Sequence, residues 1–130
     1  MKSLLFSVCI SALTASSALA AKCKDIEINI HNHENELMKV VQIRAYNEND
    51  DKWRTIRSAN FEVSPASTGT YMRVTENVPG SRNEQVGIRV KYKFVYGGNN
   101  TRYETDSSIK TCTTGQSYDT AIPSSGHRPD

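Results

Sequence analysis

The stretch from Gln85 to Tyr96, QVGIRVKYKFVY, constrains the fold more than any other part of the chain. Apolar or aromatic side chains occupy every second position: Val86, Ile88, Val90, Tyr92, Phe94 and Tyr96. The intervening positions are small or charged: Gly87, Arg89, Lys91 and Lys93. A period of two over this length predicts a β-strand with one face in a core and the other in water, because a helix would spread the apolar residues around all its sides. Other strands must therefore cover the apolar face of this one.

Shorter segments with strand character, separated by turn signals, occur along the rest of the chain. They are residues 25–30, 37–46, 53–56, 59–63, 70–76, 102–109 and 116–122. No segment places apolar residues at helical spacing over three turns. Seven or eight short strands predict an all-β fold, an antiparallel two-sheet β-sandwich. It is immunoglobulin-like only in the broad sense, because the Cys–Trp–Cys spacing of antibody domains is missing.

Two details of this prediction concern the first strands. The polar residues 31–36, HNHENE, predict the turn of an antiparallel hairpin, because six residues are too few for a parallel crossover. In the strand that follows, Val41, Ile43 and Ala45 are expected to share the inner face.

The two ends of the chain differ from its middle. Residues 1–20 combine Lys2, an apolar run of about ten residues and a small-residue cleavage site at 18–20, which predicts a signal peptide. The run is too short for a transmembrane helix, which needs about 20 apolar residues. Residues 21–122 are expected to form one β-sandwich domain, and residues 123–130, PSSGHRPD, a flexible C-terminal tail. The protein should thus be secreted or periplasmic, with no transmembrane segment.

Two cysteines and a nearly balanced charge remain after the signal peptide is removed. Cys23 and Cys112 are expected to form one disulfide in an oxidising compartment. The bond would close a loop of about 90 residues, a constraint worth about 4–5 kcal/mol in the chain-entropy model. Loss of Lys2 lowers the basic residues from 16 to 15 against 14 acidic ones, so the formal net charge falls from +2 to +1. This balance argues against nucleic acid as a partner.

Two polar turns carry side chains that metal ions prefer. His31 and His33 form an H-x-H pair that could supply two ligands to zinc, copper or nickel, and a third ligand would have to come from elsewhere. Asn47, Asp50 and Asp51 offer oxygen ligands for calcium. Neither turn has a complete motif, and such residues are equally typical of plain solvated turns. We therefore expect no cofactor and keep both turns as alternative metal sites.

A basic stripe and a single tryptophan are the candidate binding features. Arg89, Lys91 and Lys93 lie on the outer face of the central strand, where they can meet an acidic partner or simply keep the sheet soluble. Trp53 can be a core residue, a protein hot spot or a platform on which a sugar stacks. A flat, exposed ring would favour the sugar, whereas a buried ring would favour the core.

The motifs of catalytic nucleophiles, metalloproteases and phosphate-binding loops are missing, so the chain is not expected to be an enzyme. A small, signal-bearing sandwich with one disulfide is typical of a rigid scaffold that displays loops or a sheet face. The sequence therefore predicts a non-catalytic binding domain for a protein partner, for example an inhibitor or an immunity protein. The alternative is a carbohydrate-binding module, assisted by calcium at residues 47–51 and by Trp53.

Overall fold

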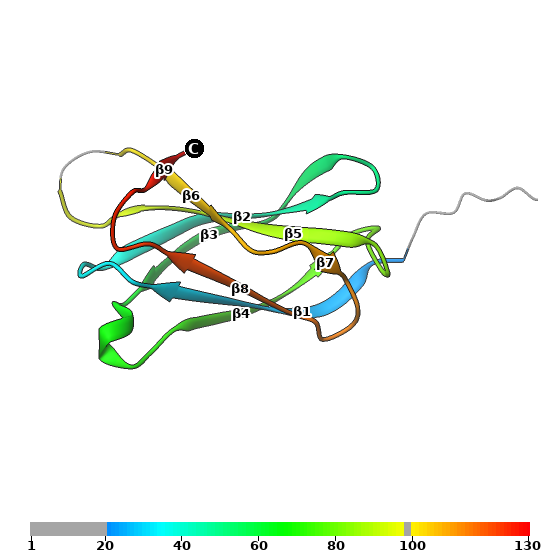
Figure 1. Cartoon of the computed structure of the whole chain (residues 1–130), viewed down its shortest axis with the longest axis horizontal. Helices are drawn as coiled ribbons and strands as arrows, with labels where there is room; N and C mark the ends of the chain where they lie inside the picture. Colours follow the sequence, from blue (N-terminus) through cyan, green and yellow to red (C-terminus); the bar gives the residue numbers. More distant parts are fainter. Residues whose placement is uncertain (1–20, 98–99) are drawn as a thin grey trace, which may run out of the picture.

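The computed structural model of the chain describes residues 21–97 and 100–130. The predicted signal peptide, residues 1–20, lies outside the described residues. In the described part, the predicted all-β fold with two sheets and one disulfide is confirmed (Figure 1). No helix there is long and apolar enough to cross a membrane.

The strands form a small and a large sheet that face each other (Figure 1). The small sheet has the order β4-β1-β8, with β1 at Cys23–Asn32, β4 at Met72–Val78 and β8 at Ser117–Ile122. The large sheet has the order β3-β2-β5-β6-β9, and β7 also pairs with β5. Its strands are β2 (Met38–Asn47), β3 (Lys52–Val63), β5 (Gln85–Phe94), β6 (Tyr103–Asp106), β7 (Lys110–Thr111) and β9 (Arg128–Pro129). One 3-10 turn, Ala66–Thr68, precedes β4. Strand pairs are antiparallel except β1 with β8, which run side by side in the same direction.

The inner sides of both sheets form one core, to which β5 contributes as its alternation predicts. Four of its side chains are at most 1% exposed: Val86, Ile88, Val90 and Tyr92. Phe94 packs partly buried against the same core. Tyr96 lies beyond the end of β5 and is 66% exposed, so its predicted inward position is wrong. The pairing with β2 ends at Phe94, and past that point the alternation no longer decides where a side chain points.

A β-bulge in β2 changes the predicted register. Opposite β5, Val41 is the extra residue between two regular pairs. Since the alternation shifts by one residue there, Val40 and Ile43 both face the core, whereas Val41 is only half-buried. The prediction is therefore wrong for Val41 and right for Ile43 and Ala45. A bulge inserts a residue into one strand only, so the pattern of that strand does not locate it.

The topology differs from the prediction in two further places. The two strands expected between residues 53 and 63 are one strand, β3, with irregular pairing to β2. Residues 31–36 do not close a hairpin but carry the chain from the small sheet to the large one. Asn32 stabilises this crossing, because its fully buried Nδ2 donates to the carbonyl oxygens of Glu36 and Val63 at 2.8 and 2.9 Å. A buried amide needs such partners, and only the tertiary structure brings them together.

The predicted disulfide between Cys23 and Cys112 is confirmed, with Cα atoms 6.1 Å apart. Cys23 begins β1 in the small sheet, and Cys112 follows β7, which pairs with β5 of the large sheet. The bond therefore links the two sheets covalently. Structural disulfides persist in oxidising compartments, which fits the expected export of the chain.

Residues 123–130, expected to form a flexible tail, instead lie along the edge of the large sheet, where β9 pairs with β6 (Figure 1). Nδ1 of His127 lies 2.7 Å from the hydroxyl oxygen of Tyr92, and Nε2 lies 2.8 Å from the carboxylate of Glu34. These partners are 35 and 93 residues away in the sequence, which is why local composition predicts only a tail.

Candidate functional site

The side of the large sheet that points away from the core, here named the outer face, gathers the most varied side chains. Its members are Lys39, Arg44, Tyr46, Trp53, Gly87, Arg89, Lys91, Lys93, Glu104 and Asp106. The strand register aligns Arg44, Arg89 and Asp106 in one row across β2, β5 and β6. Trp53 and Gly87 flank Tyr46 in the next row. Side chains in neighbouring rows of a sheet are close enough to interact.

A hollow of about 250 Å³ opens on the outer face. Its lining comes from β2, β3, β5 and the segment around the end of β6: Tyr46, Trp53, Gly87, Ile88, Asp106, Ser107 and Ile109. We name it the Trp53 hollow. Ile109 packs closely over Gly87, because a Cβ at position 87 would lie 2.9 Å from Cγ1 of Ile109 and would displace this wall. Ile109 is 44% exposed, so an apolar wall of the hollow faces solvent.

Trp53 extends across the outer face instead of entering the core. Its ring centroid lies 4.0 Å from the guanidinium carbon of Arg89 and 5.6 Å from that of Arg44. Trp53 is on β3 and Arg89 on β5, so both side chains lean across β2, which separates these strands. Tyr46 packs beside the indole, with ring centroids 5.0 Å apart. The ring is half-buried, and a cation covers part of it, a favourable arrangement that resembles neither a core tryptophan nor an open sugar platform.

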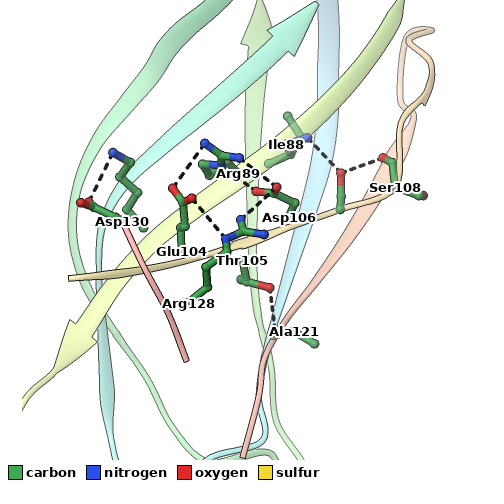
Figure 2. A network of polar contacts seen from close by, with 11 residues as sticks. Ile88, Arg89, Glu104, Thr105, Asp106, Ser108, Ala121, Arg128 and Asp130 are labelled. Atoms are coloured by element: carbon green, nitrogen blue, oxygen red, sulfur yellow. Dashed lines mark hydrogen bonds and ion pairs between the residues drawn. The ribbon is translucent and has the colours of Figure 1, made fainter. Parts of the chain in front are cut away.

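An ion-pair network joins β5, β6 and β9 (Figure 2). It borders the hollow because Asp106 belongs to both. Nε and Nη2 of Arg89 donate to the two carboxylate oxygens of Asp106 at 2.8 and 3.0 Å, and Nη1 lies 3.3 Å from Glu104. Arg128 of β9 reaches the same two carboxylates at 3.2 and 3.0 Å. Burial raises the pKa of Asp106, but the hydrogen bonds from Arg89 and Arg128 outweigh this effect and hold that pKa below its usual value. The hydrogen bonds to Asp106 also raise the pKa of Arg89.

This network changes the interpretation of the predicted basic stripe. The charge of Arg89 is neutralised by β6, and Nζ of Lys91 lies 3.3 Å from the side-chain carboxylate of Asp130 (Figure 2). Lys93 forms no ion pair with any residue that the structure describes. The stripe is therefore not uniformly basic, because two of its three cations are paired within the chain.

Unbalanced positive charge remains elsewhere on the outer face. Lys39, Arg44 and Lys93 have no ion-pair partner within residues 21–97 and 100–130. Lys39 lies directly opposite Lys93 in the pairing of β2 with β5, an arrangement that is destabilising for like charges. Nε of Arg44 is buried and has no hydrogen-bond partner in the described part of the chain.

The predicted calcium loop is held by contacts within the protein. Asn47 is buried, and its side-chain amide is hydrogen-bonded within the fold. Asp50 forms an ion pair with Arg54 at 3.1 Å, and Asp51 accepts a hydrogen bond from the hydroxyl of Tyr46. Asp51 thereby helps to orient Tyr46, an aromatic wall of the Trp53 hollow.

The predicted histidine site lies at the end of β1 in the small sheet. The rings of His31 and His33 are stacked with centroids 6.3 Å apart, and His31 also stacks on Tyr71 at 4.8 Å. The neighbouring carboxylate of Glu34 hydrogen-bonds to His127, which lowers the pKa of Glu34. Among the residues with described positions, no group of three or more His, Cys, Asp or Glu side chains is placed to hold a metal ion.

A hydrogen-bonded chain links Glu34, His127 and Tyr92 at the edge of the core. Its order of carboxylate, imidazole and hydroxyl is the order that activates nucleophiles in many enzymes. Tyr92, however, is 0% exposed and packs against Tyr103, so a substrate cannot approach its hydroxyl. Burial raises the pKa of Tyr92 to about 12, which keeps the hydroxyl protonated. These hydrogen bonds among Glu34, His127 and Tyr92 hold the C-terminal segment on the sheet.

Sequence reasoning identified Trp53 and Arg89 but not the other residues that make a site around them. One of them carried a signal, since a glycine inside a strand, here Gly87, often marks a close approach of another segment. Tyr46, Asp106 and Ile109 carried none, because their proximity depends on how the strands pair. No protein-family model, curated protein or solved structure matches this chain. The chemistry of the outer face is therefore the basis for a functional proposal.

Proposed function

We propose that this protein is a secreted or periplasmic, non-catalytic binding domain that recognises a protein partner through the outer face of its large sheet. The observation that carries this proposal is the Trp53 hollow, a solvent-open apolar site with aromatic walls and a bordering network of charges. Protein interfaces share this anatomy, because a few aromatic or apolar anchors supply most of the binding energy and polar groups surround them. The disulfide and the predicted signal peptide support the proposed location.

The walls of the hollow are held in place before any partner arrives. Arg89 forms ion pairs with the carboxylates of Glu104 and Asp106 and also contacts the ring of Trp53. The hydroxyl of Tyr46 is hydrogen-bonded to Asp51. Fewer side-chain rotations are then lost on binding, which raises affinity without enlarging the contact area.

Two other functions receive less support. A carbohydrate-binding module would offer an open aromatic face, whereas Arg89 covers part of the Trp53 ring at 4.0 Å. A hydrolytic enzyme would need an accessible nucleophile beside its base, and the hydroxyl that faces His127 belongs to the buried Tyr92.

The test compares two single substitutions, each of which introduces a negative charge at an exposed position. A partner is first isolated from the secreted or periplasmic fraction of the host with the mature protein, and its affinity is then measured by calorimetry with purified components. Ile109→Asp places a charge in the apolar wall and should weaken binding at least about tenfold, the loss expected at a buried anchor. Ala121→Asp, at an exposed position of β8 in the small sheet, is the control and should bind like the wild type.

Equal affinity of Ile109→Asp and the wild type would overturn the proposed surface. Binding to purified glycans that is lost in Ile109→Asp and kept in Ala121→Asp would replace the protein partner with a carbohydrate.

A further inference from the structure

Resting on the proposed function, we infer the chemistry of the partner segment: one aromatic side chain enters the Trp53 hollow, and a carboxylate next to it pairs with Arg44. The inference joins the size of the hollow to the charges that the outer face leaves without partners.

The size of the hollow selects its occupant. Pockets for drug-sized ligands measure roughly 300–1,000 Å³, and a cavity of about 150 Å³ already accommodates benzene. The Trp53 hollow, at about 250 Å³, lies between these limits. One aromatic side chain therefore fills it, with room for its Cβ and backbone at the mouth. Tyr46 and Trp53 supply ring partners for such a side chain, and Ile109 supplies an aliphatic wall.

The charges of the outer face select the neighbouring group. Within the described residues, Glu104 and Asp106 pair with Arg89 and Arg128, and Asp130 pairs with Lys91. Glu62, opposite Lys39 in the pairing of β2 with β3, is the acid of this face that forms no ion pair there. Lys39, Arg44 and Lys93 remain without such partners there. An acidic segment complements this surplus, whereas a basic segment would be repelled.

Arg44 is the cation best placed to receive the carboxylate. Its guanidinium carbon lies 5.6 Å from the ring centroid of Trp53, which lines the hollow. Its Nε is buried and lacks an acceptor in the described part of the chain, so the group is only partly satisfied. A carboxylate beside the aromatic anchor would pair with the guanidinium group in a partly desolvated setting, where the geometry of arginine is favourable.

Three small probes distinguish the contribution of the aromatic ring to binding from that of the carboxylate. N-acetyl-L-phenylalanine carries both, its primary amide carries the ring alone, and N-acetyl-L-alanine carries the carboxylate with a methyl group. Each is titrated into isotope-labelled mature protein and followed by NMR. We expect N-acetyl-L-phenylalanine to bind with a roughly millimolar Kd. It should shift the amide signals of Gly87 and Ile109 and the indole signal of Trp53. The amide should bind about two- to fivefold more weakly, and N-acetyl-L-alanine more weakly still.

Two variants assign the effects, and circular dichroism confirms that each is folded. Arg44→Gln should remove the difference between acid and amide while the ring still binds. Gly87→Ala, whose Cβ meets Ile109 at 2.9 Å, should reduce binding of both phenylalanine probes. Equal affinity of acid and amide in the wild type, or no shift at the hollow, would overturn the inference. A protein partner that loses affinity in Ile109→Asp would still support the proposed function in either case, so the two failures are distinguishable.

Discussion

The two faces of β5 are equally regular in the sequence and differ in what the fold does with them. The inner face presents four side chains with one fate, burial in a common core: Val86, Ile88, Val90 and Tyr92. The outer face presents four positions with four different environments. Gly87 borders a hollow, Arg89 joins two carboxylates, Lys91 pairs with the C-terminal residue, and Lys93 faces another lysine.

The difference follows from the range and direction of the forces. Burial of apolar surface is non-directional, so any inward residue of suitable size gains by it. Ion pairs and hydrogen bonds need a specific partner at a specific distance, so each outer position depends on the neighbouring strand. Three experiments test this difference between the two faces.

The largest effect is expected on the inner face. Ile88→Ala removes a side chain that is 1% exposed and should lower the free energy of unfolding by about 2–5 kcal/mol, through lost burial and the cavity left behind. Lys93→Ala, five residues further on the outer face, should change it by less than about 0.5 kcal/mol. Urea unfolding of both variants measures the contrast. Similar losses for the two would mean that the register of β5 is shifted by one residue.

A smaller and pH-dependent effect is expected from the network at Asp106. Asp106→Asn should cost about 1 kcal/mol at neutral pH, because Arg89 and Arg128 lose a charged acceptor. The pKa of Asp106 is lower in the folded than in the unfolded chain, so its contribution is complete above the unfolded pKa of about 3.9 and is lost as pH falls through the folded pKa.

The stability difference between wild type and Asp106→Asn should therefore shrink as the pH falls from about 5 toward 2. Unfolding curves at several pH values and constant ionic strength provide the measurement. A difference that stays constant down to pH 2 would show that the carboxylate of Asp106 is not stabilised by its arginine partners.

The smallest effect should have the opposite sign. Lys93→Gln removes the repulsion between Lys93 and Lys39 across β2 and β5, and should stabilise the fold by a few tenths of a kcal/mol, near the lower end of cross-strand pair energies of about 0.2–1 kcal/mol. The gain should fade at high salt, which screens exposed charges. A loss of stability would indicate that Lys93 has a stabilising contact after all.

Much of the scaffold could be predicted because it rests on local patterns. The alternation of β5 identified its buried side chains, and the two cysteines that follow the predicted signal peptide had one possible pairing. The errors have local causes too: the bulge at Val41 adds one residue to a single strand, and residues 31–36 cross between the sheets, where the buried amide of Asn32 stabilises them. Neither the bulge nor the buried amide leaves a periodic signal.

The candidate site depends on contacts between distant parts of the chain. Trp53 could be singled out by its rarity, but its position over the outer face follows from β3, β2 and β5 being neighbours in that order. Arg89 meets Asp106, 17 residues away, and Arg128 joins them only because β9 pairs with β6. The alternation within each strand fixes which residues can be buried together, and hence which fold class and core are possible. Tertiary structure alone decided which cations are paired and where a hollow opens, since these depend on strand order and register.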